Sequence, residues 1–177
     1  MSSRTQTVLD HLLDKLETAE TPLGSKTLGE VAQEIGRIFG VEPDEVAILE
    51  LLPSGKALKF VIPEKLRAVG EIPLTSTTAL AARTARERRA DIANNFATSR
   101  HASVFEGVPL GRQQNVVIHK IMSAPLLLGD KVIGVVQISR KGVSRAACGP
   151  DFTPKELSEL QGLSSLLCRF LTLSRAE

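Results

Sequence analysis

The stretch from Ile121 to Gly142 reads IMSAPLLLGDKVIGVVQISRKG, and it decides the fold. Two apolar runs flank Gly129-Asp130, where glycine at the first central position suits a two-residue type II′ hairpin turn. The β-branched residues between Val132 and Ile138 favour a pleated, largely buried strand. Pro125 cannot donate a hydrogen bond to a neighbouring strand, so we expect it at a sheet edge or a bulge. We interpret the stretch as the central hairpin of an antiparallel sheet.

The composition is typical of one globular domain. The 177 residues suit a single domain of ordinary size, with 42% hydrophobic and 24% charged residues. We predict one domain over residues 1–177, with an N-terminal helical segment in 1–24 and a core in 25–173. A net charge of only +2 and the lack of Trp and Tyr argue against a nucleic-acid partner.

The cysteines and the hydropathy indicate the compartment. Cys148 and Cys168 do not make a disulfide framework, so a reducing cytoplasm is expected. Residues 1–10 contain no apolar signal core, and no apolar run approaches the length of a membrane span. We therefore expect a cytoplasmic protein without a membrane partner.

Two helices are predicted in the N-terminal part of the chain from apolar residues at helical spacing. The first covers Thr5 to Glu20, where its narrow apolar stripe requires a packing partner. The second runs from Leu28 to Phe39. Thr27 and Glu30 fit a capping box at its start, and Gly40 can supply a left-handed stop at its end.

Two further helices follow. The third is predicted from Leu74 to Arg89, with Ser76 as a plausible N-terminal cap. The last helix has the clearest start signals, because Thr153 can cap it, Pro154 occupies the first helical position and Glu156 completes a capping box. Its leucine-rich sequence continues to the end of the predicted core.

Strands occupy the middle of the chain. Val46 to Leu52 and Leu58 to Ile62 read as a hairpin, and Ala90 to Ala93 as a short strand. Asn94 to Gly111 has no firm periodicity, and loops of that length inside a compact domain are often functional. Helices at both ends of the chain around a mainly antiparallel sheet define an α+β domain.

The order and spacing of these predicted helices and strands resemble those of a GAF domain over roughly residues 28–171. The motifs that carry the resemblance are Leu28-Gly29-Glu30-Val31-Ala32, Phe39-Gly40-Val41, Ser123-Ala124-Pro125-Leu126, Lys131-Val132-Ile133-Gly134-Val135-Val136-Gln137-Ile138 and Asp151-Phe152-Thr153. The resemblance implies a profilin-like central antiparallel sheet of five to six strands. It further implies terminal helices packed on one face and a small-molecule pocket on the other.

The resemblance also implies a set of ligand-binding residues. A loop from Asn94 to Val108 would roof the pocket, and the sheet would form its floor. Amide, hydroxyl and imidazole groups around an apolar cleft orient small polar ligands. The candidate residues are Asn94, Asn95, Phe96, His101, Phe105, Glu106, Ser123, Gln137 and Ser139. Turn capping by the asparagines and anchoring of the loop by the phenylalanines are the structural alternative.

The ligand itself is not identified by these residues. Cyclic-nucleotide-binding GAF domains show an Asn-Lys, Phe and Asp-Glu pattern, which Asn94, Phe96 and Glu106 echo loosely. Asn95 stands in place of the lysine, and the acidic residues are spaced differently. A cyclic nucleotide is therefore not the expected ligand, and the cofactor is unknown.

Metal binding and catalysis are not predicted. His101 and His119 have no carboxylate or cysteine at a familiar metal-ligand spacing. Free-methionine sulfoxide reductases share the GAF fold and use several active-site cysteines, whereas only Cys148 and Cys168 are present here. A reductase of this kind stays as an alternative in which Cys148 is the nucleophile.

Four arginines between Arg83 and Arg89 are a separate feature of the third predicted helix. Such a run can contact phosphate or a partner protein. It is also typical of the solvated end of a helix, where cations interact favourably with the negative end of the helix dipole. The sequence leaves both interpretations open.

The GAF resemblance implies a non-enzymatic sensory or regulatory domain that binds a small molecule in signal transduction. Many members dimerise through their terminal helices, so we expect a homodimer. The predicted interface residues are Leu9, Leu12, Leu16, Leu163, Leu167 and Phe170. A dimerising protein-interaction module without a ligand is the alternative.

Overall fold

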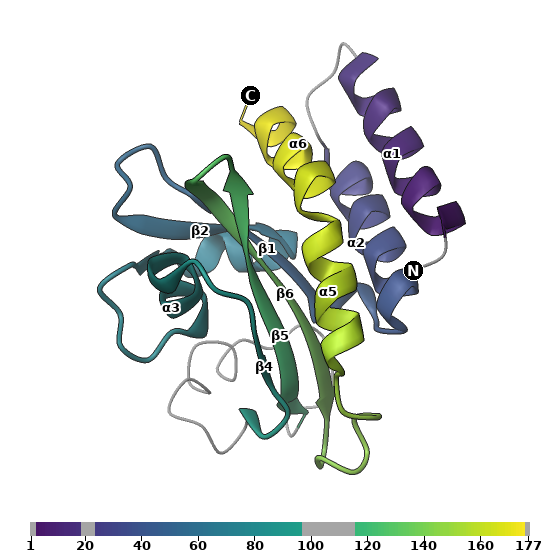
Figure 1. Cartoon of the computed structure of the whole chain (residues 1–177), viewed down its shortest axis with the longest axis vertical. Coiled ribbons are helices and arrows are strands. Elements are labelled where there is room, and N and C mark those ends of the chain that lie inside the picture. Colours follow the sequence, from purple (N-terminus) through teal and green to yellow (C-terminus); the bar gives the residue numbers. More distant parts are fainter. Residues whose placement is uncertain (1–2, 19–23, 97–115, 176–177) are drawn as a thin grey trace.

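A single antiparallel sheet organises the structure. The computed structural model describes residues 3–18, 24–96 and 116–175. Within these ranges, six strands pair in the order β3-β2-β1-β6-β5-β4 (Figure 1). In chain order the elements are α1 (Ser3–Thr18), α2 (Ser25–Phe39), η1 (Pro43–Glu45), β1 (Val46–Leu51), β2 (Ala57–Ile62), η2 (Glu64–Val69), β3 (Glu71–Pro73), α3 (Leu80–Glu87), β4 (Asp91–Ala93), β5 (Val117–Leu128), β6 (Lys131–Gly142), α5 (Pro154–Gly162) and α6 (Ser164–Ser174). The predicted α+β class is confirmed.

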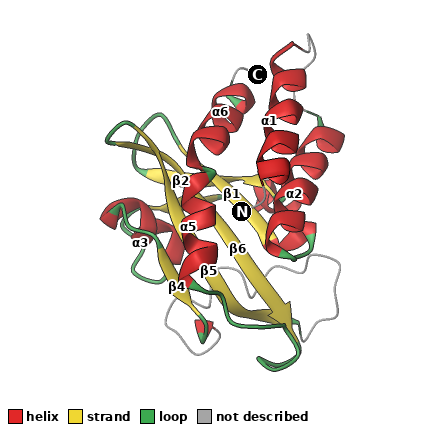
Figure 2. Cartoon of the chain, turned by 45° about the vertical axis from the view of Figure 1, so that its right-hand side comes forward, coloured by secondary structure: helices red, strands yellow, loops and turns green. Residues whose placement is uncertain are grey.

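Helices cover the two faces of the sheet unequally. The helices α1, α2, α5 and α6 form a layer on one face, and the short α3 lies on the other (Figures 1 and 2). Successive side chains of a strand point to opposite faces. In β6, Val136 and Ile138 therefore pack under the helical layer, whereas Val135 packs in the core beside α3. Gln137 shares the α3 side of the sheet with Val135.

The β5–β6 hairpin has the predicted turn. Leu128 pairs with Lys131 across the turn, and Gly129 has a φ of +63°. Asp130 does not have a positive φ, so the turn is type II′ rather than type I′. The expectation for Pro125 is also confirmed, because β4 pairs with β5 only from Ile121 to Ser123 and leaves Pro125 on an edge.

The start of α2 corrects one prediction. The helix begins at Ser25, and its N-cap Gly24 makes no side-chain hydrogen bond. The predicted capping box of Thr27 and Glu30 is wrong because Thr27 lies inside the first turn instead of preceding it. The predicted stop is confirmed, since Gly40 is left-handed with a φ of +65°.

The start of α3 is also later than predicted. The helix begins at Leu80 rather than Leu74. Ser76 does not cap it but closes a preceding turn, where its hydroxyl accepts hydrogen bonds from the N–H groups of Thr78 (3.4 Å) and Ala79 (3.1 Å). Such side-chain bonds compete with helical backbone bonds and explain the delay. The helix ends at Glu87, and its C-cap Arg88 has a φ of +50°, which is uncommon outside glycine.

The predicted capping box of the last helix is confirmed. The Thr153 hydroxyl accepts a hydrogen bond from the N–H of Glu156 (3.3 Å), and the Glu156 carboxylate accepts one from the N–H of Thr153 (3.1 Å). Pro154 occupies the first helical position. Leu163 then divides the predicted single helix into α5 and α6.

The terminal helices use their apolar residues within the chain. Leu9, Leu163, Leu167 and Phe170 are fully buried in the core under the helical layer. Their assignment to a dimer interface is corrected, because residues buried in the core of one chain cannot contact a second. The periodicity showed an apolar face without showing that α2 and the sheet cover it. Leu12 is only partly buried against the same core, and the side chain of Leu16 lies outside the described residues.

An ion cluster holds α1 against α6 at the surface of this layer. The Arg169 guanidinium pairs with Asp10 at 2.9 Å, with Asp14, and with Glu17 at 2.7 Å. The hydrogen bond from Arg169 lowers the pKa of the Glu17 carboxyl below its ordinary range. These contacts fix the direction of α1 relative to α6.

Gly134 is where the helical layer approaches the sheet most closely among the glycines described. A Cβ atom at this position would lie 2.4 Å from the Leu49 carbonyl oxygen of β1 and 2.5 Å from a methyl group of Leu171 in α6. Real Cβ atoms do not make such contacts. Hydrogen at this position is therefore required for β1, β6 and α6 to pack together.

Gly134→Ala should destabilise the fold, with Gly29→Ala as its matched control. The added methyl group at Gly134 forces backbone and Leu171 to move, which costs about 1–3 kcal/mol. A Cβ atom added at Gly29 would have no other atom within 4 Å, so alanine there should add up to about 1 kcal/mol of stability through helix propensity. Urea unfolding of both variants measures the difference, and equal stabilities would contradict this account of the packing.

Candidate functional site

Three predicted floor residues gather on the α3 side of the sheet. Ser123 of β5 pairs directly with Gln137 of β6, and Ser139 follows Gln137 by two residues on the same face. All three are nearly inaccessible to solvent: 0% for Ser123, 1% for Gln137 and 5% for Ser139. The structure therefore brings these residues together as predicted, although a ligand-binding role stays a prediction.

A directional hydrogen-bond chain connects this floor to α3. Thr84 donates its hydroxyl proton to the Leu80 carbonyl oxygen (2.9 Å), so its oxygen is left to accept from Ser123 (2.7 Å). Ser123 in turn accepts a hydrogen bond from the Gln137 amide nitrogen (3.1 Å). Each hydroxyl thus donates once and accepts once along the chain.

The Gln137 amide group faces Ser123 with its nitrogen, which donates to the serine hydroxyl. The observed orientation therefore leaves the Gln137 Oε1 atom without a partner. It is the one buried side-chain polar atom without a hydrogen bond in the described parts of the chain. A buried acceptor of this kind costs about 1–3 kcal/mol until a donor reaches it.

A small cavity lies beside Gln137. Its volume is about 10 Å³, which is the space of roughly one water molecule. Polar and apolar side chains both line it. Its described lining residues are Asp44, Glu45, Ala47, Pro63, Leu66, Ile118, Ile121, Gln137, Ser139 and Lys141.

Charged groups lie at one end of this cavity. Glu45 is 7% exposed, and its carboxylate accepts hydrogen bonds from the N–H groups of Glu42 (2.9 Å) and Lys141 (2.6 Å). The Lys141 ammonium donates to the Asp44 carbonyl oxygen (2.9 Å), and the Ser139 hydroxyl donates to the Glu45 carbonyl oxygen (3.3 Å). The cavity is therefore bordered by an anion, a cation and neutral hydrogen-bonding groups.

The predicted roof is only partly described. His101, Phe105 and Glu106 lie outside the described residues. Phe96 is 1% exposed and packs with Leu80, Ile118 and Ile121. Ile118 and Ile121 also line the cavity, so Phe96 packs against two of its lining residues.

The two asparagines do not line the described cavity. The Asn94 amide group exchanges two hydrogen bonds with the Phe152 backbone, donating to its oxygen (3.1 Å) and accepting from its N–H (2.9 Å). This pairing joins the end of β4 to the start of α5, which favours the structural interpretation of Asn94. Asn95 is exposed and makes a contact of its own.

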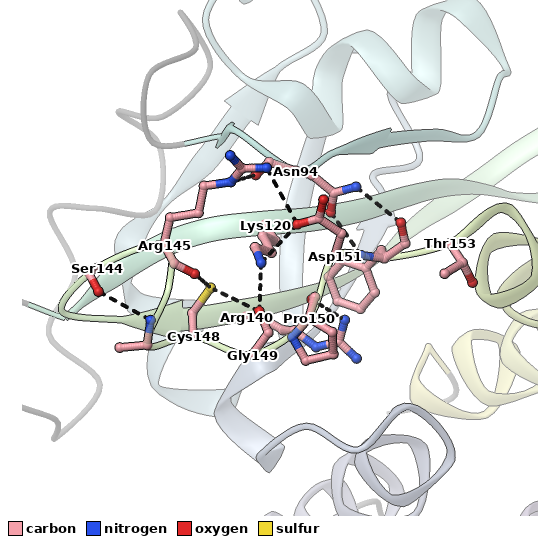
Figure 3. Close-up of polar contacts among 12 residues, drawn as sticks. Asn94, Lys120, Arg140, Ser144, Arg145, Cys148, Gly149, Pro150, Asp151 and Thr153 are labelled. Atoms are coloured by element: carbon pink, nitrogen blue, oxygen red, sulfur yellow. Dashed lines mark hydrogen bonds and ion pairs between the residues drawn. The ribbon is translucent and has the colours of Figure 1, made fainter.

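Two buried cations fix the loop between β6 and α5 (Figure 3). Lys120 of β5 donates to the Gly149 carbonyl oxygen (2.6 Å) and pairs with Asp151 (2.9 Å). Arg140 of β6 donates to the Pro150 carbonyl oxygen (2.8 Å) and stacks over the Phe152 ring at 4.0 Å. Buried charges require such partners.

The two cysteines lie in different environments. The Cys148 thiol is in this loop and donates to the Arg145 carbonyl oxygen (3.1 Å) (Figure 3). Cys168 is buried under the helical layer, and burial raises the pKa of its thiol. The sheet therefore separates the Cys168 thiol from the cavity at Gln137.

The described ranges contain neither a cluster of metal-ligating side chains nor a membrane-spanning helix. No group of three His, Cys, Asp or Glu side chains there is arranged to hold a metal ion. His119 instead contacts the Gly142 carbonyl oxygen through its Nε2 atom (3.1 Å). No helix in the described ranges has both the length and the apolar character needed to cross a bilayer.

Sequence reasoning missed two polar residues around the floor: Thr84 and Glu45. Thr84 lies four residues after Leu80 on an otherwise alanine-rich helix face, which was a usable signal for a buried hydroxyl. Glu45 and Lys141 are 96 positions apart and meet only because β1 and β6 pair. No local pattern links them.

The fold and the floor together define a class of domain. It is a small α+β domain with a helical layer on one face of an antiparallel sheet and a small cavity on the other. Residues 25–169 match the GAF domain family. The chain therefore belongs to the GAF domain family.

Solved structures support the fold. The GAF domain of an Acinetobacter phosphoenolpyruvate-protein phosphotransferase has a TM-score of 0.64 at 14% identity, covering 98% of this chain and 92% of that one. Residues 122 to 287 of a methyl-accepting chemotaxis protein reach 0.63 at 11% identity, covering 94% and 98%. The free methionine-R-sulfoxide reductase of Neisseria meningitidis reaches 0.59 at 14% identity, covering 97% and 90%. No curated protein sequence matches the chain.

The Lys120–Asp151 pair predicts a loss of stability in acid. The hydrogen bond from Lys120 lowers the pKa of the Asp151 carboxyl below its ordinary range. The stabilisation is therefore complete above the ordinary aspartate pKa and is lost as the pH falls through the lowered value. Asp151→Asn should reduce the melting temperature at about pH 7 and barely change it at about pH 2. The melting temperatures are measured by circular dichroism. Equal reductions at both pH values would contradict the assignment.

Proposed function

We propose that this GAF domain is a non-enzymatic sensory or regulatory module that binds a small polar molecule at the Gln137 floor. The unpartnered Gln137 Oε1 atom carries the proposal. It is buried, the amide nitrogen of the same side chain donates to Ser123, and Gln137 lines a cavity. A ligand that donates a hydrogen bond to this oxygen would remove the cost of an unsatisfied acceptor.

The lining indicates what such a ligand carries. The Gln137 oxygen requires an N–H or O–H donor, and the Lys141 ammonium at the cavity border favours an acceptor or an anion on the ligand. Ala47, Leu66 and Ile121 provide apolar contacts for its body. We therefore infer a compact molecule with a donor at one end and an acceptor at the other.

Binding of such a molecule requires a conformational change. A cavity of about 10 Å³ does not accommodate a metabolite, so lining residues such as Pro63, directly before η2, and Leu66 within it would have to shift. A ligand that binds only the opened form displaces the equilibrium toward it. That change in population is the signal in this proposal.

The main alternative from another class is a reductase. The structural similarity to a free methionine-R-sulfoxide reductase suggests this alternative, but similarity at 14% identity shows only the fold. Cys168 lies behind the sheet from the cavity, which leaves Cys148 as the single thiol outside the helical layer. This separation supports the non-enzymatic proposal, and Cys148→Ser would abolish any reductase activity.

Dimerisation stays a prediction, with a revised surface. Because Leu9, Leu163 and Leu167 are buried in the chain, a dimer would have to use exposed parts of the terminal helices. Native mass spectrometry of the purified protein distinguishes one chain from two. It also distinguishes a dimerising module without a ligand from a ligand-bound domain, since a bound molecule adds mass.

Gln137→Met tests the ligand site, and Gln33→Met on the exposed side of α2 is the matched control. Thermal shift of the wild type against amino acids, nucleobases and short amides should reveal a stabilising ligand. At about 100 times its Kd, a ligand adds about 2.7 kcal/mol, or about 5–10 °C in a chain of this size. Gln137→Met should lose most of this shift and Gln33→Met should keep it. Equal shifts in the two variants would reject the floor as the binding site.

A further inference from the structure

A larger hollow lies along the part of β5 that β4 does not cover. Its volume is about 420 Å³, which is within the range of small-molecule sites. It shares no lining residue with the cavity at Gln137. Its described lining residues are Arg88, Arg89, Ala90, Pro125, Leu127, Leu157, Gln161 and Ser164.

One side of this hollow is apolar. Pro125 and Leu127 come from β5, and Leu157 comes from α5. Leu127 is 37% exposed and the neighbouring Leu128 is 61% exposed, and both are among the few large apolar side chains exposed in the described ranges. Exposed apolar side chains that adjoin a hollow favour an apolar occupant.

The backbone of this edge is poorly suited to pairing with another strand. Pro125 has no N–H to donate. The Leu127 carbonyl oxygen already accepts a contact from the Cys168 thiol (3.5 Å). Side chains rather than a strand ladder must therefore determine what this hollow binds.

The other side of the hollow is cationic. The left-handed backbone of Arg88 ends α3, and its guanidinium donates to the Asp130 carbonyl oxygen (3.1 Å) of the hairpin turn. That bond holds the guanidinium of a residue that lines the hollow. Arg89 follows with a side chain that is 64% exposed and lies 3.4 Å from Glu87. A non-glycine residue held with positive φ is often found at functional sites.

The remaining lining groups are compatible with an anion. Gln161 and Ser164 contribute an amide and a hydroxyl, and both can donate hydrogen bonds. The described lining contains two guanidinium groups and no carboxylate. Arginine is the side chain best shaped to bind carboxylate or phosphate through two parallel hydrogen bonds.

We propose that the hollow between Arg88, Leu127 and Ser164 binds an organic anion with a carboxylate or phosphate head and an apolar body. The head pairs with Arg88 and Arg89, and the body lies on Pro125, Leu127 and Leu157. The site is separate from the proposed ligand site at Gln137, and neither proposal depends on the other.

The headgroup and the body are tested separately by NMR titration of the ¹⁵N-labelled full chain. Hexanoate and monohexyl phosphate should shift the backbone amide signals of Gln161 and Ser164 with saturation. Hexylamine, which has the same body and the opposite charge, should not. Acetate and inorganic phosphate should bind at least about tenfold more weakly than the hexyl compounds. Equal responses to hexanoate and hexylamine, or no saturable shift at Gln161 and Ser164, would overturn the proposal.

Arg89→Gln and Arg37→Gln form a matched pair for locating the cation. Arg37 is 61% exposed and pairs with Glu34 on α2, so both substitutions remove one exposed arginine beside a glutamate. Arg89→Gln should weaken hexanoate binding about tenfold, and Arg37→Gln should leave it unchanged. Equal weakening would mean that the anion follows net charge only, which overturns the site.

Arg88→Gly supplies a variant whose folding is not in question. Glycine is the preferred residue for a left-handed position after a helix, so the melting temperature should not fall. Hexanoate affinity should nevertheless fall about tenfold or more because the guanidinium is gone. An unchanged affinity in a folded Arg88→Gly protein would remove Arg88 from the site and reject the proposal.

Discussion

The contact that the rest of the structure depends on is the close approach of β1, β6 and α6 at Gly134. A side chain there would meet a carbonyl oxygen of β1 and a methyl group of Leu171 at once. The approach brings the C-terminal helix onto the central strand of the sheet and buries Leu167 and Phe170 there. Gln137 and Ser139 of β6 lie on the opposite face, where α3 leaves part of the sheet for a cavity.

On that opposite face the fold places hydrogen-bonding groups where apolar ones would be more stable. Gln137 and Ser139 occupy positions of β6 whose neighbour on the same face, Val135, is apolar. Most of their hydrogen bonds are made inside the chain, so the face is a built polar network and not a packing fault. The network leaves one acceptor, the Gln137 Oε1 atom, without a hydrogen bond in the described residues, and the proposed ligand site uses this atom.

Local signals in the sequence were sufficient for the hairpin and for the start of the last helix. The Gly129 turn and the Thr153 capping box depend on neighbouring residues, whereas the floor residues were expected from the resemblance to GAF domains. The terminal leucines could not be assigned in this way, because an apolar stripe is the same whether its own sheet or a second chain covers it. Likewise, the hydrogen bond between Thr84 and Ser123 depends on how α3 crosses the sheet, which no local pattern contains.

The helix α3 gives the two proposed sites a physical connection. Thr84 on this helix accepts from the floor serine, and Arg88 lies one helical turn later at the border of the anion hollow. The helix is short: Thr84 in its middle contacts the floor serine, and Arg88 directly after its end contacts the hairpin turn through the Asp130 carbonyl oxygen. A ligand at Gln137 that moves Ser123 therefore acts on the same rigid element that positions Arg88. Under both proposals the two ligands are linked, and any effect of the floor ligand on anion affinity must equal the effect of the anion on floor affinity.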